Sequence, residues 1–324
     1  MDKRRENNIS RAKDIFQFRE SNGMQETMDK FGIAHETVGR YCRLYKEHLR
    51  LNNIKSDELK EKKVRILLLD VETAPMLVYA WGLWKQNIDY CTQVKESWYI
   101  INWAAKWLGE DDVLHDCLTP EEITNIVHNR DNRIMKKLWF LIEEADIVIA
   151  HNLQKFDAKK INTRFIINGI NPPTKYRVVD TLLQAKKVFG FSSNRLDAIN
   201  MDLQLERKKK HEGMNMWIRC MAGDQEALTD MDNYCQQDVI ALEDTYLALL
   251  PFMSGHPNVN VFDDYTEERC SSCGSVDIHL TDSKYTTNVS RFPIYRCSSC
   301  GSLTRGRDTE LSKEKRKSLL TSIV

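Results

Sequence analysis

Two copies of the segment Cys-Ser-Ser-Cys-Gly-Ser constrain the fold more than any other feature of this sequence. They begin at Cys270 and Cys297, so two Cys-x2-Cys pairs are separated by 23 residues. Each short turn can point two thiolates at one ion, and the following glycine supplies the special backbone angle. Four sulfur ligands, Cys270, Cys273, Cys297 and Cys300, would close a tetrahedral site, which favours one structural Zn²⁺. Iron–sulfur ligation is the alternative, and disulfides are not expected in a reducing cytosol.

The residues around these cysteines, 264–310, resemble a zinc ribbon. They combine short strand-like segments with few large apolar side chains. Such a stretch depends on its metal for folding, because it cannot bury enough apolar surface by itself. The resemblance implies a small β-rich module that binds nucleic acid or another protein, and the sequence does not choose between them. Residues 311–324 are predicted to be a charged tail.

The composition bounds the class of protein. The chain has 324 residues, 42% of them hydrophobic, and its 47 basic and 47 acidic side chains cancel. This balance argues against global disorder, and the length favours two or three domains. No stretch approaches the roughly 18 apolar residues of a membrane helix. The first ten residues have no apolar core behind them, so a secretory signal is not expected. We therefore expect a cytoplasmic protein without a membrane partner.

The first 50 residues are predicted to form a small all-α module. Helices are expected at 10–21, 24–31 and 35–49, with an interruption at Gly23 and a turn at 32–33. The pattern resembles a helix-turn-helix of the resolvase or homeodomain-like kind. That resemblance implies major-groove contacts from the last helix, through Thr37, Arg40 and Arg43. Three packed helices without any DNA contact would give the same pattern. Residues 51–63 are predicted to be a charged linker.

Residues 64–255 are predicted to form an α/β domain with a mixed sheet flanked by helices. The apolar run at 66–69 is typical of a buried central strand. Strands that come early and then alternate with helices favour this class of fold. Further strands are predicted at 78–83, 97–109, 111–118, 145–152 and 176–182, and helices at 133–145, 155–169 and 231–252.

Acidic side chains follow several of these elements. Asp70 and Glu72 are two residues apart on the central strand and therefore point to one face. Two carboxylates there would repel each other and lose hydration, unless divalent cations neutralise them. Oxygen ligands alone suit Mg²⁺ or Mn²⁺. Asp157 falls at a helix start, where the helix dipole favours a negative charge. Tyr234 and Asp238 share one face of a later helix.

These residues form three motifs that resemble those of the DEDD exonuclease superfamily, which has the ribonuclease H-like fold. Asp-x-Glu at 70–72 is followed by Thr73, Asn-x-x-x-Phe-Asp spans 152–157, and Tyr-x-x-x-Asp spans 234–238. Their order and spacing match the superfamily over roughly residues 64–250. The last motif is that of the tyrosine subclass, and the set looks closest to the exonuclease domains of family B DNA polymerases.

The resemblance implies 3′–5′ exonuclease activity on DNA through two catalytic Mg²⁺ or Mn²⁺ ions, which clamp the attacking and leaving oxygens. The residues assigned to catalysis are Asp70, Glu72, Asp157, Tyr234 and Asp238, of which the four acids bind the metals and the tyrosine orients water. Those expected to hold the terminal nucleotide are Thr73, Asn152 and Phe156.

Other functions remain open at this point. The domain could instead be an RNA exonuclease or a structure-specific nuclease. In a different class, the chain could be a non-catalytic DNA-binding recruitment or regulatory protein. The expected partner is nucleic acid, with DNA favoured, and a replication or repair protein is a further candidate. If the chain is viral, its place would be the host cytoplasm.

Several other residues have structural and functional interpretations. Five tryptophans fall between 81 and 107, where a packed hairpin core is favoured over stacking on bases: Trp81, Trp84, Trp98, Trp103 and Trp107. Asp180 is interpreted as a supporting or capping acid, and His151 as a structural histidine. The basic run at 207–211 lies on a predicted loop, where it either follows substrate phosphates or is simply solvated.

Overall fold

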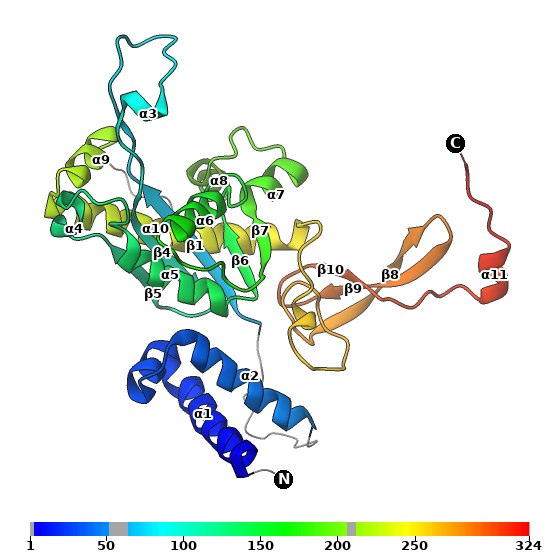
Figure 1. The fold of residues 1–324 in the computed structure, drawn as a ribbon. Helices are drawn as coiled ribbons and strands as arrows, with labels where there is room; N and C mark the ends of the chain where they lie inside the picture. Colours follow the sequence, from blue (N-terminus) through cyan, green and yellow to red (C-terminus); the bar gives the residue numbers. More distant parts are fainter. Residues whose placement is uncertain (1–2, 52–63, 206–211, 324) are drawn as a thin grey trace. The chain divides into compact units, whose positions relative to one another are not determined.

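The computed structural model describes residues 3–51, 64–205 and 212–323 (Figure 1). The chain divides into two compact units, Met1–Lys62 and Lys63–Val324. The predicted linker falls almost wholly outside the described residues, and the basic run at 207–211 falls wholly outside them. Within the described ranges, no helix is both long enough and apolar enough to cross a membrane.

The N-terminal unit contains three helical segments, as the sequence predicts. Helix α1 (Lys3–Phe31) is interrupted at Gly23, whose φ of 77° few other residues adopt, and α2 (His35–Leu51) follows a short turn. The Thr27 hydroxyl donates to the Gly23 carbonyl (2.6 Å) beside this interruption. Buried apolar side chains from both helices form the core: Ala12, Ile15, Phe16, Met24, Val38, Cys42 and Tyr45.

A five-stranded mixed sheet organises the second unit, which confirms the predicted α/β class. Its order is β5-β4-β1-β6-β7. The central strand β1 (Ile66–Thr73) is antiparallel to β4 (Ile100–Trp107), which is in turn antiparallel to β5 (Val113–Cys117). On its other side β1 is parallel to β6 (Ile147–Ala150), which pairs in parallel with β7 (Arg177–Asp180).

Two apolar cores, one on each side of β1, follow from the alternation of its side chains. Leu67, Leu69 and Val71 belong to one core, and Ile66 and Leu68 belong to the other. The neighbouring strands and the helices supply the rest of both cores. The helices of this unit are α4 (Pro120–Thr124), α5 (Asn132–Glu144), α6 (Asp157–Ile167), α7 (Thr181–Val188), α8 (Leu196–Asp202), α9 (Met214–Met221) and α10 (Gln225–Leu249). The helices predicted at 133–145, 155–169 and 231–252 are confirmed.

The segment between β1 and β4 differs from its prediction. It forms a narrow ribbon of β2 (Leu77–Val78) and β3 (Val94–Glu96), with the short helix α3 (Tyr90–Gln93) before the return strand. We call residues 77–96 the arm; Figure 1 shows it extending beyond the end of the sheet. The predicted strand at 78–83 is therefore wrong, since regular pairing ends at Val78.

The predicted packing of the five tryptophans is wrong for two of them. Trp103 and Trp107 lie on β4 and are buried between the sheet and its helices. Trp98, at the base of the arm, is half-buried. Trp81 and Trp84 are 99% and 84% exposed, because their part of the arm lies beyond the sheet, where none of the described helices covers it.

The cysteine-rich region is a three-stranded antiparallel sheet of order β10-β9-β8. Its strands are β8 (Ile278–Thr287), β9 (Ser290–Cys297) and β10 (Leu303–Arg305). Two single-turn helices, η1 (Leu250–Phe252) and η2 (Val259–Val261), connect α10 to it, and α11 (Lys313–Lys317) lies in the charged tail. The Ser302 hydroxyl donates to the Leu250 carbonyl (3.5 Å), and the Val259 N–H donates to the Ser271 carbonyl (2.9 Å).

Candidate active site and metal centres

Three carboxylates converge where the central strand meets α10. A carboxylate oxygen from each of Asp70, Glu72 and Asp238 lies within 4.8 Å of the other two. Asp70 and Glu72 continue the face of β1 that carries Ile66 and Leu68, and this face packs against α10. The structure thus brings together two acids from one strand and a third from a helix far along the chain.

Helix α10 is held in place by an N-terminal cap and by side-chain contacts with β4. Its first turn is capped by Asp224, whose carboxylate accepts from two backbone N–H groups. The buried Asn102 side chain on β4 donates to the Met231 carbonyl (3.4 Å), and Glu243 further along α10 pairs with Lys106 of β4. These contacts hold α10 across the sheet, so that Asp238 reaches the acids of β1.

Cys235 is a neighbour of the cluster that the sequence analysis did not single out. Its Sγ lies 3.6 Å from both the backbone oxygen and the Oδ2 of Asp70. Burial, and then the charges of Asp70, Glu72 and Asp238, raise the pKa of the Cys235 thiol well above its usual value. The signal was available, because Cys235 lies three residues before Asp238 and therefore shares its side of the helix.

Asp157 lies beside this group rather than within it. It is the first residue of α6, as predicted, and is 2% exposed. Burial raises the pKa of Asp157 well above its usual range, and the charge of Asp70 raises it further, while the backbone N–H groups of Asp157 and Val71 oppose the shift. The carboxyl is therefore costly to ionise unless a cation is present.

A supporting acid shapes the turn before α6. Asn152 has a φ of 78°, and its N–H donates to Oδ1 of Asp180 (3.1 Å), which also caps α7 by accepting from the Leu183 N–H. His151 lies between the Thr181 hydroxyl and the Asn194 carbonyl, 2.9 Å from each. Asp180 and His151 thus have the structural positions expected of them, and they set the conformation from which Asn152 and Asp157 are presented.

A buried ion pair that the sequence analysis did not predict anchors α6. Arg164 and Asp131 are 2% and 0% exposed and form two short contacts, Nε–Oδ2 of 2.6 Å and Nη2–Oδ1 of 2.7 Å. Asp131 also accepts from the Ile100 N–H (3.1 Å) and the Asn168 side chain (2.8 Å). The pair therefore ties the helix of Asp157 to the start of β4.

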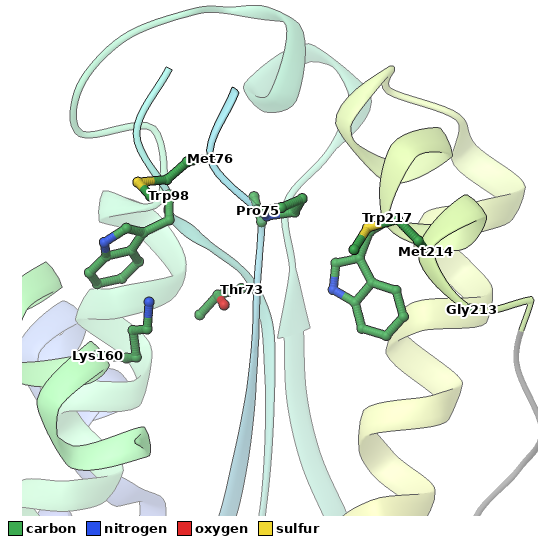
Figure 2. A pocket seen from close by; sticks show the side chains of 9 residues that line it. Thr73, Pro75, Met76, Trp98, Lys160, Gly213, Met214 and Trp217 are labelled. Atoms are coloured by element: carbon green, nitrogen blue, oxygen red, sulfur yellow. The ribbon is translucent and has the colours of Figure 1, made fainter. Parts of the chain in front are cut away.

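An apolar cleft of about 410 Å³ opens next to the acids. Figure 2 shows the indole rings of Trp98 and Trp217 on opposite sides, with Thr73 between them. The Lys160 ammonium lies 3.7 Å from the Trp98 ring centroid and 5.6 Å from that of Phe156, which is 37% exposed. The cleft is lined by Thr73, Ala74, Pro75, Met76, Trp98, Lys160, Gly213, Met214 and Trp217.

Of the predicted substrate contacts, Thr73 lines this cleft, and Phe156 lies beside Lys160. The predicted catalytic residue Tyr234 is buried in α10, one residue before Cys235. Lys160 and Trp217 were missed, since neither belongs to a motif and only the fold brings them to the end of β1.

The carboxylate cluster has the chemistry of a divalent cation site. Oxygens bound to one Mg²⁺ at about 2.1 Å are at most about 4.2 Å apart, which is close to the separation of these three acids. All the donors are hard carboxylate oxygens, as Mg²⁺ and Mn²⁺ prefer. The residues present therefore fit such ions, with Asp70, Glu72 and Asp238 as direct ligands and Asp157 near them.

The four cysteines of the repeat form a second centre. Cys270 Sγ lies 3.6 Å from Cys300 Sγ, and Cys273 Sγ lies 3.6 Å from Cys297 Sγ. Four sulfurs at about 2.3 Å from a tetrahedral Zn²⁺ are about 3.8 Å apart, so the arrangement fits zinc. A hydrogen bond with the Cys273 thiol lowers the pKa of Cys270 to about 4; desolvation opposes this shift, and backbone N–H groups add to it.

The two cysteine turns repeat in structure as well as in sequence. In each, the glycine N–H donates to the carbonyl of the first cysteine, Gly274 to Cys270 (2.9 Å) and Gly301 to Cys297 (3.0 Å). Both glycines have a positive φ, 75° for Gly274 and 76° for Gly301. The glycines thus serve the role predicted for them, because this left-handed conformation strains other residues.

The predicted DNA-contacting residues of the N-terminal unit are partly described. Arg40 is exposed on α2, and its guanidinium lies 5.5 Å from the Tyr41 ring centroid. Thr37 is half-buried in the first turn of α2. The side chain of Arg43 lies outside the described part of the chain. DNA contact by this unit stays a prediction.

Comparison with known proteins supports the fold of the second unit. Residues 113–250 match the family model of the RNase_H superfamily. This match includes Asp157, Tyr234 and Asp238 and begins after β1. No curated protein matches the chain. The domain has the ribonuclease H-like fold that the motifs predicted.

One similar solved structure is the family B DNA polymerase from the hyperthermophilic archaeon Pyrobaculum calidifontis. It is 12% identical with a TM-score of 0.39, and the match covers 58% of this chain and 26% of the polymerase. The chain thus spans about a quarter of that polymerase.

Proposed function

We propose that residues 64–255 form a metal-dependent 3′–5′ exonuclease that hydrolyses phosphodiester bonds of DNA. The observation that carries the proposal is the convergence of Asp70, Glu72 and Asp238 within 4.8 Å, at the end of the central strand of a ribonuclease H-like sheet. A scaffold without catalysis gains nothing from such a group, because partly buried like charges cost free energy unless cations neutralise them.

The roles proposed for the chain's own groups are supported by the three motifs and by the positions of these groups in the fold. When bound, two Mg²⁺ or Mn²⁺ ions would lower the pKa of a water and stabilise the leaving oxygen. Asp70, Glu72, Asp157 and Asp238 hold the negative charge that attracts these ions. Tyr234 orients the attacking water from α10.

Substrate positioning is assigned to residues around the cleft. Thr73 and Asn152 hold the terminal nucleotide, with Phe156 beside them. The 3′–5′ direction is supported by the three motifs. The choice of DNA is supported by the helix-turn-helix-like arrangement of the N-terminal unit, where Thr37, Arg40 and Arg43 would contact the duplex.

One Zn²⁺ on the four cysteines would hold the C-terminal ribbon, and elemental analysis of purified protein should find one zinc per chain.

A gel assay tests the activity. Single-stranded DNA with a 5′ label, and a matched RNA, are incubated with Mg²⁺ or Mn²⁺ and either wild-type protein or the Asp70→Asn variant. We expect a metal-dependent ladder that shortens from the 3′ end on DNA and is absent with the variant. Asp230→Asn is the matched control, since it makes the same change on the exposed side of α10.

Other outcomes assign other functions. Internal cuts would identify a structure-specific nuclease, and a ladder on RNA alone would identify an RNA exonuclease. Intact strands with wild-type protein that nevertheless binds DNA would overturn the exonuclease proposal in favour of a recruitment protein.

A further inference from the structure

The arm carries an unusual amount of exposed aromatic surface. Trp81 and Trp84 are 99% and 84% exposed, and Tyr79 and Tyr90 are 64% and 62% exposed. Free rings of this size cost free energy in water, because each leaves a large apolar face hydrated. The rings are therefore expected to have a binding partner.

The charges of the arm are compatible with a polyanionic partner. Of its two acids, Glu96 is balanced by the buried Arg130 (2.7 Å), and Asp89 caps α3 by accepting from the Thr92 N–H. Lys85 and Lys95 are exposed, and neither takes part in an ion pair of the described residues. The arm thus offers ring faces together with two available cations, which is the combination that single-stranded nucleic acids bind.

The arm is continuous with the candidate active site. Its entry at Pro75 and Met76 follows β1 directly after the acids, and its exit at Trp98 leads into β4. All three of these residues line the cleft beside Thr73 (Figure 2). A strand whose end reaches the acids through the cleft would therefore pass the base of the arm first.

We propose that the arm is a stacking platform for the single-stranded part of the substrate. Bases upstream of the terminal nucleotide stack on Trp81 and Trp84, while the terminal nucleotide enters the cleft between Trp98 and Trp217. The inference rests on the proposed exonuclease function for its direction, but the binding it describes can be measured without catalysis. A thin two-stranded ribbon offers flat rings rather than a broad face, which suits stacked bases better than the roughly 800 Å² that a stable protein partner covers.

Binding is measured in an Asp70→Asn background, so that the strand stays intact. Anisotropy of a labelled single-stranded oligonucleotide compares this protein with the same protein carrying Trp81→Ala and Trp84→Ala. We expect at least about tenfold weaker binding, since each lost stacking contact weakens binding several-fold or more. Trp81→Phe with Trp84→Phe should recover most of the affinity, because ring faces are kept. Ile166→Ala, which removes a 77% exposed apolar side chain from α6, should change nothing.

A small substrate separates this inference from the proposed function. The p-nitrophenyl ester of thymidine 5′-monophosphate is small enough to reach the acids without touching the arm. The wild-type protein and the variant with Trp81→Ala and Trp84→Ala, both with Asp70 intact, should hydrolyse this ester at the same rate. The variant should degrade the long strand more slowly than the wild-type protein does. If the wild-type protein hydrolyses neither substrate, the proposed function fails, and the anisotropy still decides the role of the arm.

Unchanged affinity for the single strand after both alanine substitutions would overturn the stacking platform. So would a change in oligomeric state on the same substitutions, seen by sedimentation, with strand affinity intact; the arm would then be a contact between copies of the chain.

Discussion

The two candidate metal centres of this protein are built in opposite ways. The thiol centre takes its ligands from two turns of identical sequence, and each turn supplies two ligands within four residues. The carboxylate centre takes Asp70 and Glu72 from a central strand and Asp238 from a helix more than 160 residues later. In the first centre the local chain geometry holds the ligands, and in the second a whole sheet and its helices do so.

Their surroundings differ in the same sense. Strand β1, which carries Asp70 and Glu72, lies between two apolar cores, so burial of apolar side chains can stabilise the sheet before any ion binds. The strands of the cysteine-rich region (β8–β10) are mostly exposed, and Cys270 and Cys297 are among the few buried side chains of that region. The thiol centre is therefore expected to stabilise its module, whereas the carboxylate centre is expected to destabilise its domain until cations arrive.

The largest effect is expected at the thiol centre. Replacing Cys297 by Ser should abolish zinc binding and unfold the ribbon, because structural zinc contributes about 10 kcal/mol or more to modules of this kind. Elemental analysis and amide hydrogen exchange check this, with protection lost in β8–β10 and kept in β1 and β4. Cys91→Ser, at an exposed cysteine of the arm, is the control. A ribbon that stays protected without zinc would remove the contrast between the centres.

At the carboxylate centre, activity and stability should move apart. Asp157→Asn should lower the rate of strand degradation by about 10³-fold or more, since a buried charge that acts on the reacting groups is lost. The fold should survive, because the amide has nearly the same shape and needs no cation to balance it. Steady-state degradation and thermal melting of the same preparations measure both quantities. Loss of folding together with activity would contradict this prediction.

The pH dependence of the metal-free protein sharpens the same point. Because the pKa of Asp157 is raised in the folded state, the folded protein holds this proton to higher pH than the unfolded chain does. Stability should therefore fall as pH rises from the unfolded pKa toward the folded one. Denaturant unfolding in the presence of a chelator should show this loss in wild type and not in Asp157→Asn.

A further test removes a structural contact, the Arg164–Asp131 ion pair, rather than a candidate metal ligand. Arg164→Ala leaves Asp131 buried without its cation, which should cost about 3–5 kcal/mol of unfolding free energy. Since the pair anchors the helix of Asp157, activity should fall with stability, and zinc content should not change. Chemical denaturation and elemental analysis measure the two. Lys137→Ala removes a more exposed cation from its contact with Asp116 and serves as the control.

The smallest expected effect is at the surface. Arg133 makes two contacts of 2.8 Å with Glu122, and this side-chain hydrogen bonding lowers the pKa of Glu122. Because the pKa is lowered on folding, the contribution is present above the unfolded pKa and is lost as pH falls through the folded one. Glu122 is half-buried and its partner Arg133 is in contact with solvent, so Glu122→Gln should cost at most about 1 kcal/mol at neutral pH and nothing in acid. Unfolding curves at both pH values check the difference, which has the opposite pH dependence to that of Asp157.

Much of the fold could be predicted because its signals are local. The apolar runs of β1 and β6 and the amphipathic pattern of α5 each lie within one short window. The arm was misread for the same reason. Tyr79 and Trp81 have the composition of a strand, but whether an aromatic is buried depends on what packs over it, and these two rings remain 64% and 99% exposed.

By itself, the sequence predicted both candidate ligand sets. The four cysteines follow from their spacing and the acids from three motifs, because residue type and separation along the chain are enough to recognise them. Only the tertiary structure decided what surrounds the acids. It placed Cys235 against Asp70, Arg164 against Asp131, and Trp217 across the cleft from Trp98. These neighbours are distant in sequence. Cys235 meets Asp70 because β1 and α10 bury apolar side chains in one core, and the other pairs meet because α6 and α9 pack their own apolar faces into the domain.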